Sequence, residues 1–451
     1  MSWITNYRTP AQYRYILHYC SHELSPLLNS ASYIKREAAK CVACGLCLPH
    51  CPTYGLLHDE SESPRGRLSL MLALAKAELP LSDKLELHLA RCLDCRACEK
   101  VCPSYVSYGL ALDSTRALIE TAREPSASPA ARSVSMLQWL VEKPGRVRTL
   151  GKILWLYRLS GLQWLLRTSR LLKLFGFAEL EENLASPPTP KAAAEIYPTE
   201  GKSKGKVTIF TGCLTQITDQ QTLISAIRLL NRLGYEVHVP PDQGCCGALH
   251  LHSGLPEKTA ELMDQNIKAL TGDTGPILCA ASGCTATLSE YAKYRESDKS
   301  AERFSSRVTD LNQFLAGLAW SSDIAFRPLN KRIAVHDPCT LTNVLRQEDK
   351  PYALLARIPG AEIIPLPDNS LCCGAAGTYH LTQTRIARQL RAPKIDHLRR
   401  LAPDILVTSN SGCAMYLAAG IHEAGLAIEV MHPVVLLERQ IQNGAGTRAP
   451  L

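Results

Sequence analysis

Two runs of four cysteines with identical spacing constrain this 451-residue chain more than any other feature. Each run reads C-x2-C-x2-C-x3-C-P, and every cysteine of the second run lies 51 positions after its counterpart in the first. The members are Cys41, Cys44, Cys47 and Cys51, followed by Cys92, Cys95, Cys98 and Cys102. Contiguous runs of this kind ligate [4Fe–4S] clusters, so the sequence predicts two such clusters.

The geometry of the runs also predicts how the ligands are shared. Three cysteines in a tight loop wrap three irons of one cluster, whereas the fourth, stiffened by the following proline, points toward the neighbouring cluster. We therefore assign the first cluster to Cys41, Cys44, Cys47 and Cys102, and the second to Cys92, Cys95, Cys98 and Cys51. Zinc saturates at four ligands, and disulfides at such tight spacing suit small secreted chains rather than a long one.

The segments between and after the runs favour helices. Behind Pro64, apolar residues recur at helical spacing, and residues 110–121 show a second helical pattern. The first pattern consists of Leu68, Met71, Leu72 and Ala75. We expect an α+β multidomain protein in which residues 1–123 form an α-helical, ferredoxin-like domain with two clusters.

Residues 124–205 differ in composition from the rest. Seven arginines and lysines between residues 146 and 173 interleave with leucines and with Trp155 and Trp164, behind Trp139, which predicts a basic amphipathic helical segment. Its apolar face either packs on protein or lies on an anionic membrane surface. Residues 185–206 are rich in proline, alanine and lysine, and we expect a linker there.

The remainder of the chain is an internal duplication. KVTIFTGC (206–213), GYEVHVPPDQGCCG (234–247) and PILCAASGC (276–284) recur as RIAVHDPC (332–339), AEIIPLPDNSLCCG (361–374) and DILVTSNSGC (404–413). Short β-branched runs end at each cysteine, with amphipathic stretches such as 223–230 between them. This pattern predicts two α/β units, a first CCG module at 206–330 and a second CCG module at 331–451, with the cysteines at strand ends.

Each CCG module carries four cysteines at matching positions, enough to ligate a third metal centre. The two sets are Cys213, Cys245, Cys246 and Cys284, and Cys339, Cys372, Cys373 and Cys413. The residues alone leave three alternatives open, which are an iron–sulfur cluster, a zinc site, or buried thiols without metal. Four histidines flank these motifs, and we expect hydrogen-bonded structural roles for them: His250, His252, His336 and His380.

The order of these motifs resembles the glycolate oxidase iron–sulfur subunit family. The motifs that carry the resemblance are CVACGLCLPHCPTY (41–54), SPRGR (63–67), CLDCRACEKVCPS (92–104), GCCGALHLH (244–252), ASGC (281–284), PCTL (338–341), LCCGAAGTYHLT (371–382) and SGC (411–413). Residues 124–205 and both termini lie outside the resemblance. The resemblance implies a flavoprotein (FAD) partner that oxidises glycolate to glyoxylate, with electrons passing through this chain toward a quinone or another acceptor. The iron–sulfur subunits of lactate and glycerol-3-phosphate dehydrogenases are similar and imply alternative substrates.

Heterodisulfide reductase is a further relative, whose CCG modules end in C-x2-C. In this chain Ala281 and Asn410 stand at the first cysteine of that pair, although Cys279 lies nearby. The departure argues against a thiol–disulfide enzyme. A structural or regulatory iron–sulfur protein without steady electron flux is the other alternative.

Other features exclude further classes of function. The sequence has no Gly-x-Gly-x-x-Gly after a strand and no P-loop, so we expect the isolated chain to be inactive on the substrate. Two clusters at about −2 each bring the formal charge of +8 to about +4, which gives no argument for nucleic-acid binding. The first 20 residues lack a signal-peptide pattern and no membrane span is visible, so we expect a cytoplasmic chain, with peripheral contact at the inner face of the membrane as an option.

Overall fold

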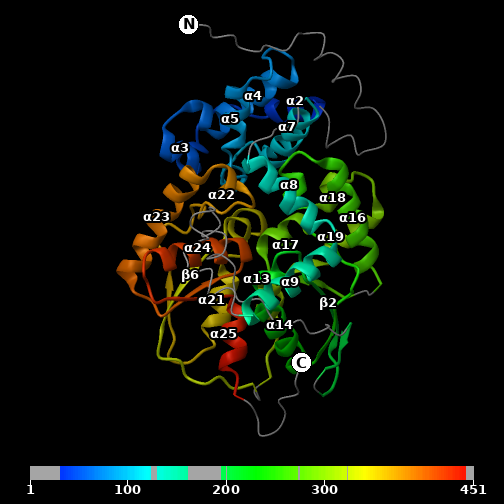
Figure 1. The fold of residues 1–451 in the computed structure, drawn as a ribbon, viewed down its shortest axis with the longest axis vertical. Coiled ribbons are helices and arrows are strands. Elements are labelled where there is room, and N and C mark those ends of the chain that lie inside the picture. Colours follow the sequence, from blue (N-terminus) through cyan, green and yellow to red (C-terminus); the bar gives the residue numbers. More distant parts are fainter. Residues whose placement is uncertain are drawn as a thin grey trace.

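The computed structural model describes residues 31–122, 129–160, 195–199, 201–272, 275–321 and 324–442. Around the two cysteine runs lie short helices, which gather at one end of the molecule (Figure 1). These are α2 (Ala31–Ala39), η1 (Leu48–His50), α3 (Pro52–Leu57), η2 (Glu60–Glu62), α4 (Pro64–Ala75), α5 (Asp83–Ala90), α6 (Ala97–Lys100) and α7 (Tyr108–Ala122). The helices predicted at 68–75 and 110–121 are confirmed as parts of α4 and α7.

The SPRGR motif forms the start of α4. The Ser63 hydroxyl accepts a hydrogen bond from the Gly66 amide at 2.9 Å, and Pro64 occupies the first turn, where its missing N–H costs nothing. A Cβ at Gly66 would lie 1.9 Å from the carbonyl oxygen of Glu60, so only glycine fits there. The backbone of the turn that precedes α4 therefore packs directly against the helix at Gly66.

Residues 129–160 form two helices, α8 (Pro129–Val141) and α9 (Pro144–Leu159). The predicted basic helical segment is therefore helical over this range, and the part of that prediction that covers residues 161–180 lies outside the described residues. None of the helices that the structure describes is long and apolar enough to cross a membrane.

The first CCG module contains a five-stranded sheet in the order β1-β3-β2-β4-β5. Its strands are β1 (Ile196–Tyr197), β2 (Gly205–Phe210), β3 (Tyr235–His238), β4 (Ile277–Cys279) and β5 (Val308–Asp310). Its helices are α13 (Thr215–Thr218), α14 (Gln220–Arg232), α15 (Ala248–Leu251), α16 (Pro256–Leu270), α17 (Ser282–Ser289), α18 (Tyr291–Tyr294), α19 (Lys299–Arg307) and α20 (Leu311–Ala316). All strand pairs are parallel except β1–β3.

Strand β1 lies inside the linker expected at 185–206, and that expectation is wrong at these residues. Ile196 and Tyr197 are a β-branched and aromatic pair, and they pair with β3 at the sheet edge. The Asn231 amide group fixes the strand by donating to the Tyr197 carbonyl at 3.0 Å. Strand β2 also begins at Gly205, one residue before the expected module boundary.

The second CCG module repeats this topology with a parallel sheet in the order β7-β6-β8-β9. Its strands are β6 (Arg332–His336), β7 (Glu362–Pro365), β8 (Ile405–Thr408) and β9 (Glu429–Met431). Its helical segments are η3 (Leu341–Leu345), α21 (Asp349–Leu355), α22 (Tyr379–Thr382), α23 (Thr384–Leu401), α24 (Ser411–Glu423) and α25 (Pro433–Gln440). The mixed helix and sheet content agrees with the predicted α+β class, whereas the domain limits at 123, 205 and 330 stay predictions.

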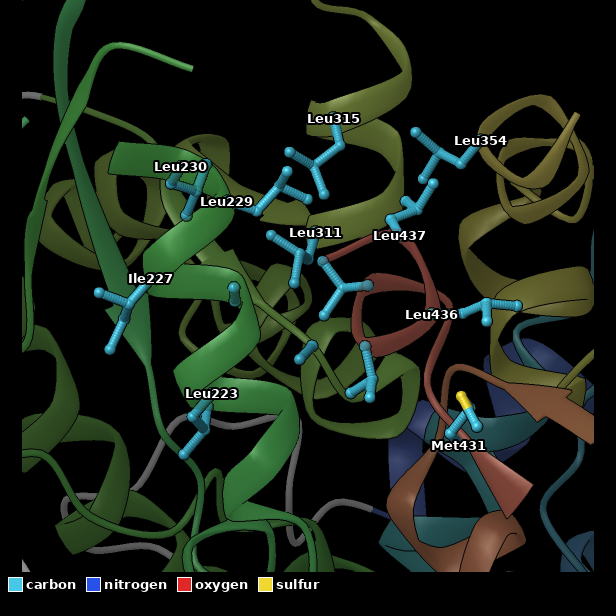
Figure 2. Close-up of a cluster of buried hydrophobic side chains, with 14 of the residues drawn as sticks. Leu223, Ile227, Leu229, Leu230, Leu311, Leu315, Leu354, Met431, Leu436 and Leu437 are labelled. Carbon is cyan, nitrogen blue, oxygen red and sulfur yellow. The ribbon is translucent and has the colours of Figure 1, made fainter. Parts of the chain in front are cut away.

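The two modules share one hydrophobic core. Leu229 of α14 points toward Leu311 of α20, with Leu437 of α25 and Leu354 of α21 beyond it, whereas Ile227 of the predicted amphipathic stretch lies on the other side of the helix (Figure 2). Leu229 and Leu230 are fully buried, as are Leu354 and Leu437 of the second module. Since α14 precedes and α25 follows the module boundary, each module completes the core of the other.

Candidate metal centres

The structure places the fourth cysteine of the first run beside the second run. A small pocket is lined by Cys51 together with Cys92, Cys95 and Cys98. Burial raises the pKa of Cys95 and Cys98 well above the ordinary thiol range, and the neighbouring thiols add to the effect. Four clustered thiols suit a soft metal centre, because the metal removes the cost of forming thiolates in a buried site.

The other first-run cysteines form a more open group. Cys44 is exposed, and Cys41 and Cys47 are half-buried. Burial raises the pKa of Cys47, with smaller contributions from Cys41 and Cys44. Cys102 and Cys41 pack on one hydrophobic cluster with α2 and α4, and Cys92 and Cys98 of the second run pack on the same cluster. The two groups therefore differ in solvent exposure, the first being nearer the surface.

The loops of the two runs have the same backbone conformation. Ala43 and Gly45 have φ values of 53° and 82°, and Asp94 and Arg96, each 51 positions later, have 50° and 58°. Left-handed conformation costs roughly 1–2 kcal/mol for residues other than glycine. Ion pairs of Arg96 with Glu99 at 2.7 Å and with Glu290 at 2.5 Å hold the second loop in this shape.

A buried charge network lies beneath the first run. The Arg67 guanidinium, 1% exposed, donates to the Glu62 carboxylate, to the Thr53 hydroxyl at 2.9 Å and to the His88 carbonyl at 2.7 Å. The same Glu62 carboxylate lies 2.8 Å from His88 Nδ1 and 2.7 Å from Arg91. The network joins the segment after the first run to the segment before the second one.

All eight predicted CCG cysteines line one cavity of about 930 Å³. They lie after the carboxyl ends of parallel strands, as predicted, but the two modules open into the same space. Ser282 of α17 donates its amide to the Ser409 carbonyl at 3.0 Å and contacts the Thr340 hydroxyl at 2.8 Å, which closes the seam between the modules. The sequence repeat could not show this meeting, because it identifies two units without their relative orientation.

Within each module the sulfur atoms are close together. The Sγ atoms of Cys213 and Cys245 are 3.3 Å apart, and those of Cys339 and Cys372 are 3.9 Å apart. Each module also has two adjacent cysteines, and the second of them is Cys246 in the first module and Cys373 in the second. Its pKa is lowered because neighbouring thiols donate hydrogen bonds to it. Both modules therefore hold several buried thiols close to one another, a donor set that fits a metal or an iron–sulfur centre.

The second run lies against the second module. Leu93 and Cys95 pack in one hydrophobic cluster with Cys339 and Cys372. Asn343 donates to the Cys95 carbonyl at 2.8 Å, and the Tyr379 hydroxyl donates to the Arg91 carbonyl at 3.0 Å. The cysteines of the helical part and those of the CCG modules thus form neighbouring groups.

The flanking histidines have different surroundings. His252 contacts Asp94 at 3.1 Å and Asp113 at 3.0 Å. Partial desolvation lowers the pKa of this ring, which is 42% exposed, but the carboxylates of Asp113 and Asp94 outweigh that effect and raise the pKa to about 9. His380 contacts the Ala375 carbonyl at 3.2 Å, whereas buried His250 lies 3.6 Å from Glu142. The Asp94–Asp113–His252 group was not predicted, because its members lie far apart in sequence.

Known proteins place these features in a family. A 4Fe-4S dicluster domain model matches residues 40–106, a cysteine-rich domain model matches 207–289 and 333–418, and a model for the linker region of the glycolate oxidase iron-sulfur subunit matches 129–184. The last match corrects the expectation that residues 124–205 lie outside the resemblance. This segment is basic and rich in leucine, and it contains no cysteine motif. Its family is therefore hard to recognise from a single sequence.

The relatives are similar over most of the chain. The probable glycolate oxidase iron-sulfur subunit of Bacillus subtilis is 32% identical over 87% of this chain and 91% of its own length. The Escherichia coli glycolate oxidase iron-sulfur subunit is 32% identical over 89% and 94%. Lactate utilization protein A of Geobacillus thermodenitrificans is 30% identical over 52% of this chain and 99% of its own length.

The matched domains and the clustered thiols define an iron–sulfur protein with a dicluster part and two cysteine-rich repeats. Its chain carries [4Fe–4S] clusters. More particularly, it belongs to the glycolate oxidase iron–sulfur subunit family.

Proposed function

We propose that this chain is the electron-transfer subunit of an acceptor-linked 2-hydroxy-acid dehydrogenase that oxidises glycolate to glyoxylate. The observation that carries the proposal is the packing of Cys95 against Cys339 and Cys372, which brings the dicluster part next to the CCG cavity. Iron–sulfur clusters supply one-electron transfer. The residues of this chain hold the clusters, and around the second run Cys51 is buried whereas Cys92, Cys95 and Cys98 are half-buried.

The hydride of glycolate needs a two-electron acceptor, and the sequence has no nucleotide-binding motif to hold one. The partner is therefore a flavoprotein subunit carrying FAD, and a quinone or another acceptor receives the electrons. The similarity to lactate utilization protein A favours lactate as the second candidate substrate. The thiols proposed as ligands are those of the two runs, with Cys51 and Cys102 exchanged, and a centre in the CCG modules.

The isolated, flavin-free chain should not oxidise glycolate with an artificial dye. Its visible iron–sulfur absorbance should bleach only when glycolate and the flavoprotein subunit are both present, because hydride removal occurs on the partner. Lactate in place of glycolate is the matched comparison. Turnover by the flavin-free chain would contradict the proposed division of labour, and faster bleaching with lactate would change the substrate.

Helices α8 and α9 expose an apolar surface that we propose for peripheral contact with an anionic membrane. Met136, Trp139, Ile153, Leu156 and Leu159 are 54–71% exposed. Exposed cations lie among them: Arg132, Lys143, Arg148 and Lys152. Apolar insertion combined with attraction to anionic lipid is the basis of interfacial helix binding.

The double substitution Ile153→Glu/Leu156→Glu should abolish sedimentation with anionic vesicles. Wild-type binding should weaken as salt rises, because screening reduces attraction between the cations and the lipid. An exposed position on another helix, Leu87→Glu in α5, is the control. Equal binding to neutral vesicles, or binding by the double variant, would contradict membrane contact through these helices.

A further inference from the structure

The two CCG modules differ at one pair of facing residues. In the first sheet the last register pair between β2 and β4 is Phe210 opposite Cys279, and in the second sheet the last pair between β6 and β8 is His336 opposite Thr408. Phe210 and His336 each precede the first module cysteine by three positions, and Cys279 and Thr408 each precede the last one by five. The pairs therefore occupy equivalent places in the duplicated fold.

In the first module the Phe210–Cys279 pair adds a fifth thiol to the group of four cysteines. The side chain of Cys279 is 2% exposed and interacts with Cys284, which in turn contacts Cys246. Phe210, on the opposite strand, has no metal-binding atom. The fifth donor of the first module thus comes from β4.

In the second module the pair adds an imidazole from the other strand. A ring nitrogen of His336 and the Sγ atoms of Cys373 and Cys413 all lie within 4.8 Å of one another. His336 Nδ1 is 2.9 Å from the Thr408 hydroxyl, which fixes the ring and leaves Nε2 for a metal. His336 is 2% exposed.

We propose that each CCG module binds an iron-bearing centre through five protein donors, of which the fifth is Cys279 in the first module and His336 in the second. Thr408 is a positioning residue that holds the imidazole. The proposal rests on the iron–sulfur assignment but not on glycolate as the substrate. Imidazole in place of thiolate removes one negative ligand, so the second centre should have the higher reduction potential, as in other histidine-ligated clusters.

Pulsed EPR of anaerobic protein labelled with ¹⁵N-histidine, poised by redox titration, tests the assignment. Wild-type protein should show the strong nitrogen coupling of a coordinated imidazole, and the label should shift it. His336→Asn should remove this coupling and the iron of the second module. Cys279→Ser should remove the iron of the first module and leave the coupling in place.

The double variant His336→Phe/Thr408→Cys copies the Phe210–Cys279 pair into the second module. It should retain the iron, lose the nitrogen coupling, and titrate at a lower potential than wild type. The proposal would be overturned if the wild-type protein contained only as much iron as the two dicluster centres need, or if the modules contained zinc. It would also be overturned if the EPR spectrum did not change with the ¹⁵N-histidine label. Iron in the dicluster part is measured in every variant, so a failure of the overall iron–sulfur assignment is seen separately.

Discussion

Cys51→Ser should eliminate the cluster bound by the second run, and Cys102→Ser should eliminate the one bound by the first. Each substitution should remove about four of the eight irons of the dicluster part, because serine is a poor substitute for a thiolate ligand. The structural reason is that Cys51 lines the same pocket as Cys92, Cys95 and Cys98. The measurement is iron content together with EPR of the reduced variants.

The two surviving clusters should differ in their environment. In Cys51→Ser the remaining cluster is the more exposed one, near exposed Cys44, and in Cys102→Ser it is the less exposed one, beside buried Cys51. Water-soluble relaxation agents should therefore broaden the EPR signal more strongly in Cys51→Ser. A matched control is Cys279→Ser, which should leave both dicluster signals intact. Loss of the cluster nearest in sequence to each substitution would show that the fourth cysteines are not exchanged.

Glu62→Gln should lower the free energy of unfolding of the dicluster part by about 3–5 kcal/mol, the usual cost of removing one partner of a buried ion pair. The Glu62 carboxylate is 1% exposed and forms ion pairs with Arg67 and Arg91, and it also contacts His88 Nδ1. Without its charge, the Arg67 guanidinium stays buried with no anionic partner. Denaturant unfolding under anaerobic conditions, followed by helical circular dichroism, measures the loss.

The substitution should also accelerate cluster loss from Cys51. The Arg67 side chain donates to Thr53 and to the Glu62 carbonyl, and both of these groups contact the Cys51 sulfur. Glu261→Gln, which breaks an exposed pair with Lys258, should leave stability unchanged. An unaltered unfolding midpoint in Glu62→Gln would mean that the network is dispensable.

Local patterns predicted the local structure well. The apolar spacing behind Pro64 and the stretch at 223–230 became α4 and α14, since helical periodicity and caps are encoded within a few residues. The short β-branched runs before the cysteines became β2, β4, β6 and β8. By contrast, Ile196 and Tyr197 were missed, because two residues are too few for a strand pattern and their pairing partner lies about 40 positions away.

For the candidate site too, the sequence predicted the local motifs but not how they meet in space. Spacing identified the cysteines, but it could not show that both CCG sets line one cavity. His336 was expected to have a hydrogen-bonded structural role, and its contact with Thr408 agrees with that. Its closeness to Cys373 and Cys413 depends on the parallel pairing of β6 with β8 and on the start of α24, contacts between residues up to 77 positions apart.

The core built from α14, α20, α21 and α25 has a consequence for how the chain could have evolved. The repeat in the sequence implies that one gene segment was copied, yet each copy now contributes side chains to a core that both share. A break near residue 330 would expose Leu229 and Leu230 on one fragment and Leu354 and Leu437 on the other, all fully buried in the intact chain. Such fragments would persist only if they reassembled at once. The two repeats therefore depend on one shared core, and we expect them to unfold as one cooperative unit.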